Sequence, residues 1–137
     1  YTNFKFKKVA NWEADYVFMR TSELILTEAE ALARDNDGAT AATVLKELMV
    51  NRDPAWNKST VTGEDVYQLR RVELWGEGFS FFDHLRLKKG IDRNYAGTNH
   101  LASQRLVVPA GDWLFLFQIP LREIQNNDLI TESDQNP

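Results

Sequence analysis

The residues best suited to chemistry lie in one stretch, Leu69–Gly90, where acids, bases and large aromatic side chains occur together. Glu77 and Asp83 could act as a carboxylate pair on a glycosidic bond, one as general acid and the other as base or nucleophile. Charges enclosed by aromatic side chains need partners, because an unpaired buried charge is costly. The stretch therefore also holds a candidate structural ion-pair cluster, which comprises Arg70, Glu73, Glu77, Asp83 and Arg86.

The spacing of these charges favours the structural interpretation. Arg70 and Glu73 are three positions apart in the sequence, and so are Asp83 and Arg86. Residues at this spacing are neighbours on a helix surface, where opposite charges attract. We therefore expect the cluster to join two helices, and we expect no catalytic residue in the chain.

The composition argues against thiol chemistry, metal sites, phosphate-binding loops and nucleic-acid binding. The chain has no Cys, which removes thiolate nucleophiles, disulfides and Cys-based zinc sites. Two histidines, His84 and His100, are too few for a His-rich metal centre, so we expect no metal and no cofactor. Gly76 and Gly78 do not match a phosphate-binding motif and predict a tight corner between helices. A net charge of -4 argues against nucleic acid as a partner.

Aromatic side chains in loops are the candidates for contact with a ligand. Their flat apolar faces can stack on sugar rings, and their polar edges can stay in water. Trp56 lies in a polar loop and Tyr95 in the long loop Gly90–Ser103, and we take these two as ligand-binding candidates. Trp75 falls inside a predicted helix and Trp113 opens a predicted strand, so we expect both to pack against other side chains.

The elements that must position these residues are mainly helices. Apolar residues recur at helical spacing in several segments, and Pro or Gly lies at or near most of their ends. The predicted helices are Tyr16–Arg34, about Thr40–Arg52, about Glu64–Glu77, about Phe79–Lys89 and Leu121–Gln125. The stripe expected to face the core in the first helix consists of Phe18, Ile25, Ala29 and Leu32.

Strands are predicted near both ends of the chain. Tyr1–Val9 alternates aromatic and basic residues, and Arg105–Val108 and Leu114–Ile119 flank the turn Pro109–Asp112. Short connections between helices favour antiparallel pairs. We therefore expect one domain or fragment over residues 1–137. Its fold should be mainly α, with tetratricopeptide-like antiparallel helix pairs and a short C-terminal β-hairpin.

Four blocks of this sequence, in order, resemble the C-terminal signature of the SusD/RagB family. The blocks are MRTSELILTEAEALAR (Met19–Arg34), the pair Asn51-Arg52, LRRVELWGEGFSFFDHLRLKKG (Leu69–Gly90), and IPLREIQNNDL (Ile119–Leu129) followed by DQNP (Asp134–Pro137). The third block is similar to a family run in which Glu, Gly, Asp and Arg recur at fixed spacing. The fourth is similar to the family's closing Ile-Pro and Gln-Asn-Pro segments.

The resemblance implies a non-catalytic protein that binds and delivers nutrients, mainly glycans, at a bacterial outer membrane. Members of the family face outward, are lipid-anchored, and cap a SusC-like TonB-dependent transporter. The lipid anchor and most contacts with an oligosaccharide or peptide ligand would then lie outside this chain. Two alternatives stay open, a stand-alone helical-repeat adaptor that binds peptides and a small glycoside hydrolase that uses Glu77 and Asp83.

Overall fold

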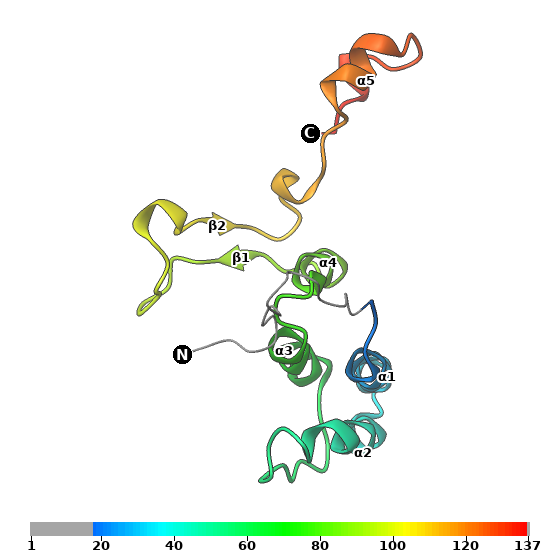
Figure 1. Cartoon of the computed structure of the whole chain (residues 1–137), viewed down its shortest axis with the longest axis vertical. Helices are drawn as coiled ribbons and strands as arrows, with labels where there is room; N and C mark the ends of the chain where they lie inside the picture. Colours follow the sequence, from blue (N-terminus) through cyan, green and yellow to red (C-terminus); the bar gives the residue numbers. More distant parts are fainter. Residues whose placement is uncertain (1–17, 137) are drawn as a thin grey trace, which may run out of the picture. The chain divides into compact units, whose positions relative to one another are not determined.

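The computed structural model describes residues 18–136, which form two compact units that divide after Leu74. The first unit contains the helices α1 (Thr21–Arg34), α2 (Gly38–Met49) and α3 (Gly63–Glu73) (Figure 1). The second contains α4 (Phe79–Arg86), β1 (Ile91–Asp92), η1 (Ala102–Gln104), β2 (Val107–Val108), η2 (Trp113–Phe115), α5 (Leu121–Asn126) and η3 (Glu132–Asp134), where η marks a 3-10 helix.

The predicted fold class is confirmed, because helices dominate and a short antiparallel β-pair lies in the C-terminal half. The strand predicted over Tyr1–Val9 lies outside the described residues. Within residues 18–136, every helix is too short or too polar to cross a membrane.

The core of the first unit lies where α1 packs against both α2 and α3. Leu26 and Ala29 of α1, Leu45 of α2 and Val66 of α3 are completely buried. Ala29 and Ala41 are small, so the backbones of α1 and α2 can approach closely. Tight packing of these side chains supplies most of the stability of such a unit, since isolated helices of this length are marginal in water.

The stripe predicted for the first helix is only partly correct. Ala29 is buried, but Phe18 is 85% exposed and precedes α1, which begins at Thr21 and not at Tyr16. The buried stripe consists of Ser22, Leu26, Ala29 and Glu30, and it includes two polar residues. The spacing of apolar residues cannot predict this face, because its two polar residues are buried through their contacts with side chains of α3.

The helix starts follow from local capping, which moves the start of the second helix. Asp37 caps α2, because its carboxylate accepts the Thr40 amide at 3.1 Å. Gly38 is therefore the first residue of α2, two positions before the predicted start at about Thr40. Thr62 and Asp65 form a reciprocal capping box at the start of α3, which satisfies amides that have no partner within the helix.

The β-hairpin uses a partner strand that the sequence did not predict. β2 lies within the predicted segment Arg105–Val108, but it pairs with β1, with Ile91 opposite Val108. The turn Pro109–Asp112 is present, yet the chain after it enters η2 because Asp112 accepts the Leu114 amide at 2.9 Å. A local cap thus replaces the strand expected over Leu114–Ile119.

The tail is tied back to the chain by the side chains of Gln135 and Asn136. The Gln135 amide both accepts from the Ile119 amide, at 2.7 Å, and donates to the Ile119 carbonyl, at 3.0 Å. Asn136 donates to the Phe117 carbonyl at 2.7 Å. The Gln135 side chain thus bonds to the main chain of Ile119 as a neighbouring strand would, and this fixes the segment that follows η3.

Two glycines allow a test of how tightly the first unit is packed. A Cβ at Gly38 would collide with the backbone carbonyl of Val61, which cannot move freely because its own amide donates to Gly38. We expect Gly38→Ala to lower the free energy of unfolding by about 1–3 kcal/mol. Denaturant unfolding of the purified protein measures this change.

Gly63→Ala is the matched control for this variant. A Cβ there would meet the Cγ of Arg34 at 2.9 Å, and this flexible side chain can move. We expect a change within about 1 kcal/mol, because Ala also favours the helix that begins there. Equal effects of the two substitutions would contradict the packing that the structure shows.

Candidate functional site

The carboxylate of Glu73 joins the ends of all three helices of the first unit. Arg20, which precedes α1, donates to its Oε1 at 3.0 Å and to the Glu73 carbonyl at 2.8 Å. Arg52, which follows α2, donates to both carboxylate oxygens, at 2.9 and 3.0 Å. Glu73 is itself the last residue of α3. Two guanidinium groups therefore share one carboxylate, and the two-pronged contact of Arg52 also fixes its direction.

These contacts change the acidity of Glu73. The hydrogen bond from Arg52, with further bonds from Arg20 and Ser22, lowers the pKa of Glu73 from its ordinary 4.5 to about 2, although burial acts in the opposite direction. The same bond raises the pKa of the Arg52 guanidinium. A carboxylate held ionised in this way is a poor general acid near neutral pH, because a general acid must carry a proton to give.

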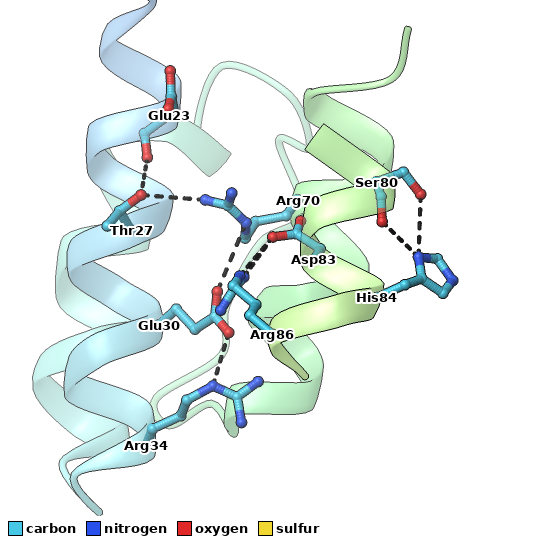
Figure 2. A network of polar contacts seen from close by, with 9 residues as sticks. All are labelled: Glu23, Thr27, Glu30, Arg34, Arg70, Ser80, Asp83, His84 and Arg86. Atoms are coloured by element: carbon cyan, nitrogen blue, oxygen red, sulfur yellow. Dashed lines mark hydrogen bonds and ion pairs between the residues drawn. The ribbon is translucent and has the colours of Figure 1, made fainter. Parts of the chain in front are cut away.

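A second ion pair joins α1 to α3 inside the unit. The Glu30 carboxylate lies between two guanidinium groups, with Arg34 Nε at 2.7 Å and Arg70 Nε at 3.7 Å (Figure 2). Arg70 also donates to the Thr27 hydroxyl at 3.2 Å. The side chains of Glu30 and Arg70 are only 6% and 7% exposed, and the Glu30 carboxylate is compensated by both guanidinium groups.

In the second unit, Asp83 and Arg86 form the ion pair that their spacing suggested. Asp83 is 3% exposed and accepts from Arg86 Nε at 2.8 Å. The nearby His84 lies close to Ser80 on the same helix, which could suggest a catalytic dyad (Figure 2). However, His84 Nδ1 lies 2.6 Å from the Ser80 carbonyl, an oxygen that can only accept. Nδ1 therefore carries the proton and cannot take one from the Ser80 hydroxyl.

Metal binding has no support in the described part of the chain. No group of three or more His, Asp or Glu side chains within residues 18–136 could hold a metal ion.

The two aromatic ligand candidates lie in different units and differ in exposure. Trp56 is half-buried, and its indole Nε1 is buried without a hydrogen-bond partner among residues 18–136. The Lys58 ammonium lies 5.8 Å from the centre of its ring and is held by Asp65 at 2.7 Å. The ring of Trp56 is therefore partly covered by its own loop, which leaves less of it open to a ligand than the sequence suggested.

Tyr95 is 54% exposed on the loop that joins β1 to β2. Figure 1 shows this loop continuing beyond the ends of both strands. The loop is held in shape at several points. The Arg93 amide donates to Leu106, the Thr98 amide donates to Tyr95, and Asp92 accepts the Asn94 amide at 2.7 Å. An ordered loop that presents an aromatic ring loses little entropy when a ligand binds.

The packing role predicted for Trp75 and Trp113 is wrong in this chain. They are 58% and 53% exposed. Trp113 follows Asp112 into a 3-10 helix and not into a strand, so it lacks the buried strand face on which the prediction rested.

Several contacts of the ion-pair network cannot be predicted from local spacing. The partner residues of Arg20 and Glu30 on α3 are 53 and 40 positions away, and helix spacing says nothing about such distances. Arg52 belongs to the Asn51-Arg52 block. That block, which ends the predicted helix, was the one signal that could have identified it.

The first unit of the chain consists of helix pairs held together by ion pairs. The second unit presents an ordered loop that carries the exposed ring of Tyr95. These features define a mainly α protein with a short antiparallel β-pair. The chain belongs to the SusD family, because the family model matches it over residues 1–137.

A solved structure agrees with this assignment. It is the crystal structure of a SusD-like carbohydrate-binding protein from Bacteroides vulgatus, which is 26% identical in sequence and superimposes with a TM-score of 0.71. The match covers 98% of this chain and 33% of that one, so this chain spans about a third of the length of the other protein. A comparison with curated proteins gave no match.

The pKa of Glu73 leads to a test of its structural role. Glu73→Gln keeps the shape of the side chain but removes its charge, and we expect it to lower the free energy of unfolding at pH 7 by about 2 kcal/mol. A group whose pKa is depressed in the folded state stabilises the fold above its unfolded pKa. In the native protein this contribution should therefore disappear as the pH falls from 4.5 towards 2.

Unfolding measured across this pH range should show a shallower loss of stability for Glu73→Gln than for the native protein. The pKa of Asp65 is also lowered, by the hydrogen bond from Lys58, so Asp65 adds the same pH dependence of stability to both proteins. Glu47→Gln, at an exposed position of α2, is the control and should leave stability nearly unchanged. The structural role is refuted if Glu73→Gln behaves like Glu47→Gln.

Proposed function

We propose that this chain works as part of a non-catalytic protein that binds glycans and delivers them to an outer-membrane uptake complex. The observation that carries the proposal is the match of the SusD family model to residues 1–137. The similar protein from Bacteroides vulgatus is described as carbohydrate-binding, which supports a glycan as the ligand.

The charged groups of the chain are consistent with binding in place of catalysis. Glu73, Glu30 and Asp83 each engage at least one guanidinium group, so their charges are used within their own units. The rival hydrolase needs Asp83 to reach a glycosidic oxygen. A side chain that is 3% exposed is poorly placed for that reaction.

The location and partner follow from the family and belong to the same proposal. The whole protein would be lipid-anchored and outward-facing at the outer membrane. Its partner would be a SusC-like TonB-dependent transporter. In that assembly the first unit would serve as scaffold and the second would offer Tyr95 to the ligand.

Replacing Tyr95 tests the contact with a ligand. We expect Tyr95→Ala to weaken the binding of an oligosaccharide by about fivefold, since one stacked aromatic contributes on the order of 1 kcal/mol. Tyr95→Phe keeps the ring and should bind nearly as well as the native protein. Calorimetric titration of the full-length protein with α-linked and β-linked gluco-oligosaccharides of equal length measures these affinities.

Asp83→Asn serves as the control, because it should lower stability and leave affinity unchanged. Turnover of a glycoside that Asp83→Asn abolishes would reject the proposal in favour of a hydrolase. Binding of short peptides by a native protein that binds no oligosaccharide would reject it in favour of a peptide adaptor. An unchanged affinity in Tyr95→Ala would remove Tyr95 from the site.

A further inference from the structure

The loop that carries Tyr95 and the turn that leads into it are rich in positive charge. The chain as a whole has a net charge of -4, yet between His84 and Arg105 the single carboxylate is Asp92. The basic residues of this segment are Arg86, Lys88, Lys89, Arg93 and Arg105. The charge of this region is therefore opposite in sign to that of the molecule.

Three of these cations are not neutralised within the described part of the chain. Arg86 is occupied, because it holds Asp83 at 2.7 Å. Lys88, Arg93 and Arg105 form no ion pair with any carboxylate of residues 18–136. The nearby Asp92 uses an oxygen to accept the Asn94 amide and so helps to shape the loop.

The fold places two of the unneutralised cations at the base of the loop. The Arg93 amide donates to the Leu106 carbonyl at 3.0 Å, which extends the β1–β2 ladder by one position. Arg105 is the residue before Leu106, so Arg93 and Arg105 both lie next to the end of this ladder, where the loop begins and ends. Arg105 Nε donates to the His100 carbonyl at 3.0 Å, which restrains its guanidinium group beside the loop. Tyr95 lies between the two arginines along the chain.

We propose that the ligand of this loop is an anionic oligosaccharide, one that carries uronate carboxylates or sulfate esters. Arg93 and Arg105 would bind its charged groups while the ring of Tyr95 stacks on a sugar. A guanidinium group can donate two parallel hydrogen bonds to either kind of anion, which gives direction as well as attraction. This inference rests on the proposed function and narrows its ligand to a charged class.

The test compares charged and neutral ligands of equal length in the full-length protein. The probes are an oligogalacturonate, a sulfated galacto-oligosaccharide and a neutral galacto-oligosaccharide, titrated at low and at high salt. The native protein should prefer the charged probes, and added salt should reduce that preference. The double variant Arg93→Gln/Arg105→Gln should weaken binding of a charged probe by about tenfold, as expected for the loss of two ion pairs near the surface. Its affinity for the neutral probe should change by less than about twofold.

Two further variants separate charge from loop structure. Arg122→Gln/Lys46→Gln removes the same charge from exposed positions of α5 and α2, and it should leave all three affinities unchanged. Arg105→Lys keeps the charge but replaces the guanidinium group that contacts His100, and it should retain most of the affinity. If the Arg93→Gln/Arg105→Gln variant loses affinity for the oligogalacturonate alone, the charged group of the ligand is a carboxylate. If it loses affinity for the sulfated probe alone, the charged group is a sulfate.

Several outcomes would overturn the inference. They are equal losses for neutral and charged probes, a native protein without preference for charge, or the same loss in the Arg122→Gln/Lys46→Gln control. If the native protein binds the neutral probe through Tyr95 but shows no preference for charge, the anionic ligand is rejected and the proposed function stands. If it binds no oligosaccharide of either kind, both are rejected.

Discussion

The first unit depends on one carboxylate. Glu73 ends α3, Arg20 precedes α1, and Arg52 follows α2, so the ends of three helices meet at a single charged group. Apolar packing between Leu26, Leu45 and Val66 supplies the cohesive free energy but has little directional preference. The hydrogen bonds to Glu73 are directional, and they fix where each helix begins or ends relative to the others. Glu30 and Arg70 play a similar part between the middles of α1 and α3.

The two units use their charges in different ways. In the first, the buried Glu30 and Arg70 face one another, and the hydrogen bond from Arg52 lowers the pKa of Glu73. In the second, Lys88, Arg93 and Arg105 are left without a carboxylate among the described residues, on or beside a loop that also exposes Tyr95. Charges that face inward hold a fold together, whereas charges left without partners are available to a ligand. This contrast is the physical basis of the proposed binding role.

The sequence predicted those features that depend on local pattern. The helices were located because their apolar residues recur at helical spacing, and in α2 the residues Ala41, Leu45 and Leu48, which have that spacing, are buried. Four motif blocks identified the family, which the family model confirms over the whole chain. The Asp83–Arg86 contact was visible from its spacing alone.

Features that depend on distant partners could not be predicted in this way. β1 is two residues long, too short for an alternating pattern, and its partner β2 follows a loop of 14 residues, numbers 93–106. Arg20 and Glu73 are 53 positions apart, so nothing local announces their contact. The buried stripe of α1 includes Glu30, whose burial is tolerable only because Arg70 and Arg34 compensate its charge. In each of these three cases the partner that decides the structure lies far along the chain.

The central claim is that the charges of the helical unit provide cohesion and take no part in ligand chemistry. The most direct test is a double-mutant cycle on Arg52 and Glu73, in which stability and oligosaccharide affinity are measured for the same four proteins. The account predicts a coupling free energy of about 1–2 kcal/mol in stability and none in binding. Coupling in binding without coupling in stability would contradict it.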